Sequence, residues 1–251
     1  MTAKDTVLAA VSDLFGKKDP SGVDRWVSAD YRQHSSLAAD GPEGMRQLIA
    51  SLPDGFRYDN VRAIADGDMV ALHGIYHGLG PEPLVAFDLF RVADGKLAEH
   101  WDALAPVVSP TASGRSQTDG PVGSSDQNQT EASRDAVTTY AEKILVGGDY
   151  STAMTNYVSE TYHQHNTETA DGLDGAGAAA KALAEQGTNI VYTKIHKIIA
   201  EGDLVVLLSE GEFGVPVAFY DLYRVADSKI VEHWDIIAPI PASLPHDNGL
   251  F

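Results

Sequence analysis

Two aspartates at the ends of matching segments are the strongest candidates for chemistry. Asp102 ends the run His100-Trp-Asp102, and Asp235 ends the same run 133 residues later. If these runs are strands, each Asp shares a face with its His, while the Trp lies on the opposite face. On the preceding strand, Asp88 or Asp221 falls among apolar residues. A carboxylate in such surroundings has a raised pKa, which suits a general acid or base near neutral pH. A buried, hydrogen-bonded Asp that only orders the end of the sheet is the alternative.

A second polar group lies upstream, in the run Tyr31-Arg-Gln33-His34. His34 could stabilise an enolate or pass a proton to Asp102. Alternatively, it could be a loop histidine that caps the third helix or bonds a backbone carbonyl. Gln33 could orient a carbonyl group, and Tyr31 is favoured as a core residue. The same residue types recur in the second half as Tyr162, Gln164 and His165.

Histidines raise the question of a metal site. His73 and His77 are four residues apart in a predicted strand, about 13 Å, which is too far to hold one ion. The set His34, His100 and Asp102 could hold a divalent ion, because two His and one carboxylate are a known ligand set. It is repeated as His165, His233 and Asp235. The spacing is unspecific, so we predict no metal and no cofactor.

These residues recur because the sequence contains an internal repeat. Of the twenty residues from Phe87, thirteen are identical to those from Tyr220. Tyr31 and Tyr162 are 131 residues apart, and Trp101 and Trp234 are 133 apart. Two separated blocks with nearly one offset indicate a tandem duplication. We therefore predict two domains, at 1–108 and 134–245, a flexible Ser/Thr/Gly/Gln-rich linker at 109–133, and a tail at 246–251.

Each half has helical spacing first and strand-like runs afterwards, the order of an α+β domain. In the first half, the expected helices lie near residues 7–15, 23–27 and 45–52. The expected strands lie near residues 57–65, 68–78, 83–92 and 96–106, with Asp-Gly turns at 66–67 and 94–95.

Composition excludes several function classes. Cysteine is absent, which removes disulfides and Cys-based metal sites. The chain has 18 Lys and Arg against 36 Asp and Glu, a net charge of −18, which disfavours binding to nucleic acids and anionic membranes. The N-terminal residues show no apolar signal segment, so we expect a cytoplasmic protein.

The motifs Tyr31-x-Gln-His34, Asp40-Gly41 and Asp88 to Asp102 resemble the SnoaL-like family of polyketide cyclases and aldol-condensation proteins. The resemblance covers both halves. It implies two tandem cone-shaped α+β barrel domains of the nuclear transport factor two-like type, each with three helices against a curved antiparallel sheet. It also nominates Asp102 and Asp235 as acid/base residues, because each follows its strand position, Asp88 or Asp221, by fourteen residues. Those partner positions are His in the cyclases, and the Asn-Pro of the cyclases is Gln-His here, so a different substrate is expected.

The expected function is a cofactor-independent lyase or isomerase acting on a small hydrophobic carbonyl compound. The catalytic candidates are Asp102, Asp235, His34 and His165. The substrate-binding candidates are Gln33, Gln164, Tyr31, Tyr162, Asp88, Asp221, His100 and His233. Epoxide hydrolysis or dehydration on the same site, a non-catalytic binding module and a metal-dependent site remain alternatives. Trp101 and Trp234 are expected to anchor the two sheets against each other as an intramolecular pseudo-dimer.

Overall fold

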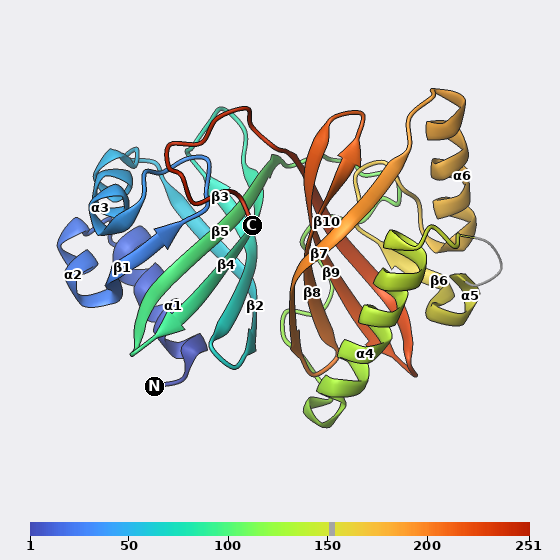
Figure 1. The fold of residues 1–251 in the computed structure, drawn as a ribbon, viewed down its shortest axis with the longest axis horizontal. Helices are drawn as coiled ribbons and strands as arrows, with labels where there is room; N and C mark the ends of the chain where they lie inside the picture. The colour runs from blue at the N-terminus through green and yellow to red at the C-terminus, as the bar shows by residue number, and fades with distance from the viewer. Residues whose placement is uncertain (151–153) are drawn as a thin grey trace. The chain divides into compact units, whose positions relative to one another are not determined.

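The computed structural model describes residues 1–150 and 154–251, and these form two compact units (Figure 1). Unit 1 consists of Met1–Val107 and Pro241–Phe251, and unit 2 consists of Val108–Ile240. In these residues no helix has the length and apolar character needed to cross a membrane.

The sheet of unit 1 has five strands in the order β1-β5-β4-β3-β2. Their bounds are β1 Val27–Gln33, β2 Arg57–Asp66, β3 Met69–His77, β4 Leu84–Ala93 and β5 Lys96–Pro106. Four strands form the predicted antiparallel meander, whereas β1 is an unpredicted fifth strand that pairs parallel with β5. The sheet is therefore mixed, and the expectation of a purely antiparallel sheet was wrong in this respect.

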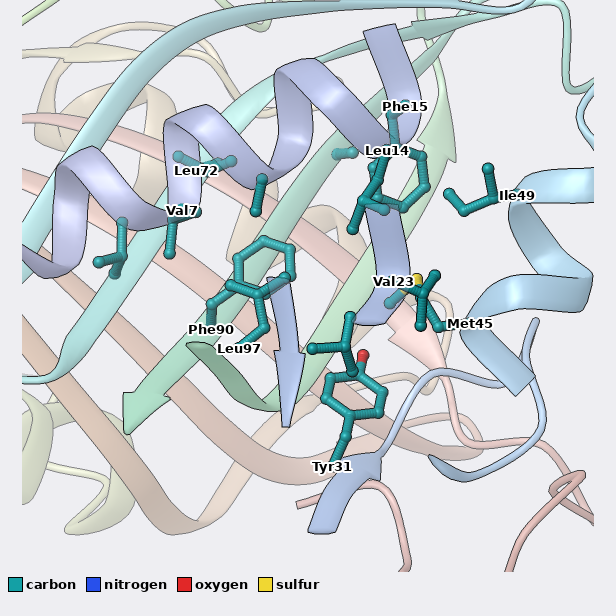
Figure 2. Close-up of a cluster of buried hydrophobic side chains, with 14 of the residues drawn as sticks. Val7, Leu14, Phe15, Val23, Tyr31, Met45, Ile49, Leu72, Phe90 and Leu97 are labelled. Carbon is teal, nitrogen blue, oxygen red and sulfur yellow. The ribbon is translucent and has the colours of Figure 1, made fainter. Parts of the chain in front are cut away.

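Three helices cover one face of this sheet. They are α1 Ala3–Val11, which continues as a π-helical turn over Ser12–Gly16, α2 Val23–Trp26 after a 3-10 turn at Pro20–Gly22, and α3 Gly41–Ser51. Val7 of α1 lies beside the strand residues Leu72 and Phe90, and Ile49 of α3 lies beside Leu14 and Phe15 in the same buried cluster (Figure 2). Apolar residues at helical spacing thus meet alternate residues of the strands, as their periodicities predict.

Unit 2 repeats this architecture, with strand order β6-β10-β9-β8-β7 and β6 parallel to β10. Its helices are α4 Thr130–Tyr140, with a π-helical turn over Ala141–Val146, α5 Met154–Tyr157 and α6 Gly172–Glu185, and a 3-10 turn spans Gln127–Gln129. Its strands are β6 Val158–Gln164, β7 Ile190–Glu201, β8 Leu204–Phe213, β9 Pro216–Ala226 and β10 Lys229–Pro239. The α+β class and the tandem arrangement of two domains are confirmed.

A two-residue turn joins the last two strands of each unit. Asp94 and Gly95 have φ values of 51° and 72°, and Asp227 and Ser228 have φ values of 49° and 60°. Two successive left-handed residues match the twist of a hairpin, and Asp-Gly is a preferred pair there. Unit 2 has a serine where unit 1 has the glycine.

The polar segment at 109–133 differs from the flexible linker that its composition predicts. It lies within unit 2 and is hydrogen-bonded to it. Arg115 forms an ion pair with Asp171 at 2.8 Å, and the Ser125 amide donates to Asp203 at 2.7 Å. The composition of the segment indicates only that it has few apolar side chains to bury. In the structure, hydrogen bonds and an ion pair made by polar side chains and backbone groups hold it in place.

Two segments leave the unit of the strand that precedes them. Residues 108–119, the linker arm, follow β5 of unit 1 but belong to unit 2. Residues 241–251, the tail arm, follow β10 of unit 2 but belong to unit 1, where the Gly249 carbonyl oxygen lies 2.9 Å from His34 Nδ1. Each repeat therefore lends a C-terminal arm to the other unit.

Trp101 and Trp234 are almost completely buried, with 3% and 1% of their surfaces exposed. Within unit 1, Trp101 is stacked by His34. Within unit 2, Trp234 Nε1 donates to the backbone oxygen of Asp119 in the linker arm, over 3.0 Å. The expected packing of the two sheets through these tryptophans stays a prediction.

Candidate functional site

β4 and β5 bring three ionisable side chains together on the helix-covered face of unit 1. Asp88 pairs with Asp102 across the two strands, and Phe90 pairs with His100. Residues directly opposite each other in an antiparallel pair point to the same face, so the structure has the shared face that strand alternation predicts. Asp88 and His100 are buried, whereas Asp102 keeps part of its surface exposed.

A chain of hydrogen bonds connects buried side chains from four strands. The Gln33 amide donates to the Tyr31 hydroxyl over 3.2 Å, and its oxygen lies 2.9 Å from His100 Nδ1. His100 Nε2 lies 3.2 Å from Asp88 Oδ1. The Tyr76 hydroxyl lies 3.1 Å from both oxygens of Asp88. The chain therefore runs from β1 through β5 and β4 to β3.

The orientation of the Gln33 amide decides where His100 carries hydrogen. Gln33 Oε1 also accepts the backbone N–H groups of His34 and Ser35, so it is the acceptor toward His100 Nδ1. The other ring nitrogen faces the Asp88 carboxyl group. A hydrogen bond between them requires one more proton, on either the imidazole or the carboxyl. The His100 ring therefore lies between the Gln33 amide and the Asp88 carboxyl group, on the same face as Asp102.

Asp102 is the group of this cluster that can exchange a proton. The pKa of Asp102 is raised to about 6, chiefly by burial; the charge of His100 lowers it, and the Asp88 carboxyl group raises it. The Ser35 hydroxyl and His246 of the tail arm act in the opposite direction. A carboxyl group with this pKa can both accept and return a proton near neutral pH.

The start of α3 holds the end of β1 in place. Asp40 Oδ1 accepts the backbone N–H of Gln33 over 2.8 Å, and Asp171 accepts that of Gln164 over the same distance. The Asp-Gly motif found in both halves thus positions the glutamine that orients the histidine.

Unit 2 contains the same chain of hydrogen bonds. The Gln164 amide donates to the Tyr162 hydroxyl over 3.3 Å, and its oxygen lies 3.0 Å from His233 Nδ1. His233 Nε2 lies 3.0 Å from Asp221 Oδ1. The Tyr192 hydroxyl lies 3.2 and 3.3 Å from the two oxygens of Asp221.

The ionisable groups of unit 2 are shifted as well. Burial opposes the charged form of His233, but the hydrogen bond to Asp221 and the charges of Asp235 and Asp221 outweigh it and raise the pKa of His233. Burial also raises the pKa of Asp235, and the charge of Asp221 raises it further. The charge of His233 and the hydrogen bond from Asn166 lower this pKa, but they do not cancel the increase.

The tyrosines at the end of each chain of hydrogen bonds come from non-equivalent strands. Tyr76 lies on β3, whereas Tyr192 lies on β7, the counterpart of β2. The sequence repeat therefore gives no signal for them, and sequence analysis missed both.

A family comparison bears directly on these two units. The model of the SnoaL-like domain matches residues 8–100 and, a second time, residues 137–233. This chain belongs to the SnoaL-like domain family. The two matches also confirm the tandem repeat.

Several solved structures are similar to part of this SnoaL-like chain. TsrD from Streptomyces laurentii is 21% identical, with 41% of this chain and 87% of that chain covered and a TM-score of 0.36. A SnoaL-like polyketide cyclase from Agrobacterium tumefaciens is 15% identical, with 42% and 92% covered and a TM-score of 0.36. A steroid delta-isomerase from Pseudomonas aeruginosa is 22% identical, with 42% and 82% covered and a TM-score of 0.36. No curated protein sequence matches the chain.

The upstream histidine of the first SnoaL-like unit is not brought to Asp102. His34 stacks on Trp101 with ring centroids 4.7 Å apart, and its Nε2 lies 2.9 Å from Glu99 Oε1. Glu99 and Trp101 alternate with Asp102 along β5, so they occupy the opposite face. Since His34 Nδ1 contacts Gly249, both ring nitrogens have partners. These contacts support an anchor for the tail arm in place of the proton shuttle expected from sequence.

His165 has the same place in the second SnoaL-like unit. It stacks on Trp234 with ring centroids 4.6 Å apart, and its Nε2 lies 3.0 Å from Glu232. Its Nδ1 lies 2.6 Å from the carbonyl oxygen of Ser116 in the linker arm. The two histidines therefore hold equivalent arms, because Gly249 and Ser116 are 133 residues apart.

His73 and His77 have separate partners, as expected from their strand spacing. The Arg62 guanidinium lies 2.7 Å from His73 Nδ1, and His77 Nε2 lies 3.0 Å from Asp59. Each of the two histidines thus has a side-chain partner of its own.

Among the described residues, a set of possible metal ligands is formed by Asp88, His100 and Asp102. The sequence had suggested His34 in the place of Asp88. Possible ligand atoms of Asp88, His100 and Asp102 lie within 4.8 Å of one another, and those of Asp221, His233 and Asp235 do the same. Both nitrogens of His100 already contact protein groups, so an ion would have to displace one of them. We assign no metal to this cluster.

Proposed function

We propose that this chain is a small-molecule enzyme that moves a proton next to a carbonyl group, in a reaction of lyase or isomerase type. The substrate class is a small, largely apolar carbonyl compound, and the reaction is an aldol-type condensation, a cyclisation or a double-bond shift. One observation carries the proposal: Asp102 is a partly exposed carboxyl group whose pKa is raised to about 6, beside buried hydrogen-bonded groups. Asp235 is the equivalent group in unit 2.

In the proposed reaction, the Asp102 carboxylate removes a proton from the carbon next to the carbonyl. The electron pair of the broken C–H bond moves to the carbonyl oxygen and gives an enolate. In the condensation, the enolate carbon attacks a second carbonyl carbon and forms a C–C bond, while the π electrons of that carbonyl move to its oxygen, which takes the proton from Asp102. In the double-bond shift, the enolate is conjugated with a C=C bond and takes the proton from Asp102 at the far carbon of that system. In both cases the Asp102 carboxylate is regenerated.

Tyr31 is the proposed donor to the enolate oxygen. Burial raises the pKa of Tyr31 well above its usual value, and the charge of Asp102 acts in the same direction, so the hydroxyl keeps its hydrogen. The oxygen accepts from Gln33, and among the described residues its hydrogen has no acceptor. A positioned donor of this kind stabilises developing negative charge. His100 and Gln33 then act as positioning residues.

Hydrogen–deuterium exchange at the carbon next to a ketone tests this proposal without knowledge of the natural substrate. The full-length protein is incubated in D₂O with cyclohexanone or 4-phenyl-2-butanone, and deuterium uptake is followed by mass spectrometry. The double variant Asp102→Asn, Asp235→Asn should lose exchange by about 10²–10⁴-fold, because Asn keeps the size of Asp but cannot take the proton.

The same double variant must keep its circular dichroism spectrum, so that loss of exchange reports chemistry. Tyr31→Phe should also lower the rate while leaving Asp102 in place. Full exchange in the double variant would discard the acid/base proposal and leave a binding module as the better account.

A further inference from the structure

The two sites differ at the residue that contacts the reactive carboxyl group. Ser35 in unit 1 corresponds to Asn166 in unit 2, at the repeat offset of 131. Asn166 Nδ2 lies 2.9 and 2.7 Å from the two oxygens of Asp235. Asn166 Oδ1 accepts the backbone N–H of Glu168 over 2.9 Å, which fixes the direction of the amide. Asp235 therefore faces a donor that cannot turn into an acceptor.

Ser35 gives Asp102 a different partner. Its hydroxyl oxygen accepts the backbone N–H of Leu37 over 3.1 Å, and hydrogen bonding by its side chain lowers the pKa of Asp102. A hydroxyl can donate or accept as it rotates, so it can follow Asp102 through loss and gain of a proton. An amide NH₂ group suits only the charged form of the carboxyl.

The arms add a second difference. His246 of the tail arm donates through Nε2 to the Ser35 carbonyl oxygen over 2.9 Å. Its Nδ1 is buried and has no hydrogen-bond partner within residues 1–150 and 154–251. At the arm offset of 133, the equivalent residue is Ser113, whose hydroxyl donates to the Gln164 carbonyl oxygen over 2.6 Å. Unit 1 thus has a titratable side chain where unit 2 has a serine.

We propose that the two sites have divided their roles: the Asp102 site carries out the proton transfer, with His246 as a positioning residue supplied by the tail arm, and the Asp235 site holds a ligand with its carboxylate fixed. This division rests on the proposed function. The tail arm contributes His246 to the unit 1 site, whereas the linker arm contributes Ser113 at the equivalent position of the unit 2 site.

The other groups around the two carboxyls are alike except for Tyr223 of unit 2, which stands where unit 1 has Phe90. The groups that face Asp102 are Asp88, His100, Tyr31, Tyr76, Ser35 and His246. The groups that face Asp235 are Asp221, His233, Tyr162, Tyr192, Tyr223 and Asn166. Each set has one Asp on the neighbouring strand and one His on the same strand as the carboxyl. The contrast in polar contacts lies in Ser35 with His246 against Asn166.

Exchanging the two contact residues tests the division. Full-length protein is labelled with ¹³C at the Asp carboxyl carbons, and pH titrations are followed by NMR in the wild type and in Ser35→Asn and Asn166→Ser. Signals are assigned by their loss in Asp102→Asn and Asp235→Asn. Ser35→Asn should lower the titration midpoint of Asp102 by about half a pH unit or more, and Asn166→Ser should raise that of Asp235 by a similar amount.

His246→Gln tests the arm in the same experiment. Glutamine can still donate to the Ser35 carbonyl oxygen but cannot carry a positive charge, so the Asp102 midpoint should rise while the Asp235 midpoint stays in place. If His246→Gln leaves the Asp102 midpoint unmoved, the role of the tail arm is overturned.

Deuterium exchange of the ketone separates this proposal from the proposed function. Asp102→Asn should lower the exchange rate at least tenfold more than Asp235→Asn does. Ser35→Asn should also lower the exchange rate. Equal losses in the two Asp variants would overturn the division while acid/base function stands. Exchange that persists in the double Asp variant would overturn the function itself.

Discussion

The carboxyl group of Asp102 is charged at neutral pH at some cost to folding. Its pKa in the folded chain, about 6, lies above the usual value of 3.8. Between these two pH values the folded state therefore binds more protons than the unfolded state, and stability falls as the pH rises through this window. A residue suited to proton transfer is in this way a destabilising residue at pH 7.

Asp102→Asn should consequently stabilise the protein at pH 7 while abolishing its exchange activity. A gain of about 1–3 kcal/mol is expected, because one pKa unit corresponds to about 1.4 kcal/mol. The gain should disappear by about pH 3, below both pKa values, where Asp102 is protonated in both states. Urea unfolding at pH 3 and pH 7 measures it. Asp235→Asn is the matched comparison and should gain less, because Asn166 already donates to that carboxylate. A variant that is less stable at pH 7 would instead make Asp102 a structural residue.

Strand alternation was enough to place Asp88, His100 and Asp102 together, because side chains in a strand have a strict period of two. It was not enough for His34, which follows the last residue of β1. Beyond a strand end, the side-chain direction depends on the local turn, and no pattern in the sequence specifies it. His246 was missed because a contact 211 residues away leaves no periodic signal.

At the level of elements, the four strands of the meander were predicted to within one or two residues, because their apolar runs are bounded by turns. β1 was not predicted. Three of its seven residues are exposed, and its partner β5 lies more than sixty residues further along the chain. Parallel pairing over such a distance is decided by tertiary packing, so local propensity does not show it.

The turn between β9 and β10 offers a test at this scale. Ser228 is exposed and has a φ of 60°, a conformation that glycine adopts without steric cost. Ser228→Gly should therefore stabilise unit 2 by about 1 kcal/mol. Gly95→Ser, the reverse change in unit 1, should destabilise by a similar amount. Thermal unfolding of the two variants measures both changes in stability. Changes of the same sign would contradict the claim that glycine is more favourable than serine at this position of both turns.

At the scale of the whole molecule, the arms make each unit depend on residues that follow the other unit in the chain. The tail arm donates from Asn248 to the Gln33 carbonyl oxygen over 3.0 Å, next to the His246 and Gly249 contacts. These bonds hold the loop that carries Ser35. We therefore expect the tail arm to stabilise this loop.

Deletion of residues 241–251 should loosen this loop and leave its counterpart unchanged. Amide hydrogen exchange over residues 33–40 should become faster in the shortened protein, because three hydrogen bonds are lost. Exchange over residues 164–171 is the internal control, since the linker arm holds that loop. Equal protection of residues 33–40 in both proteins would show that the tail arm does not support the site.

The exchange of arms has a consequence for how such a protein can change by mutation. In a pair of identical subunits, one codon would specify the arm residue at both sites, so a change at one site would be copied to the other. Here the duplicated gene has a separate codon for each arm, His246 for one and Ser113 for the other. The two sites can thus mutate and diverge separately although they lie in one chain. Loss of either copy of the repeat would remove a domain and also the arm of the domain that remains.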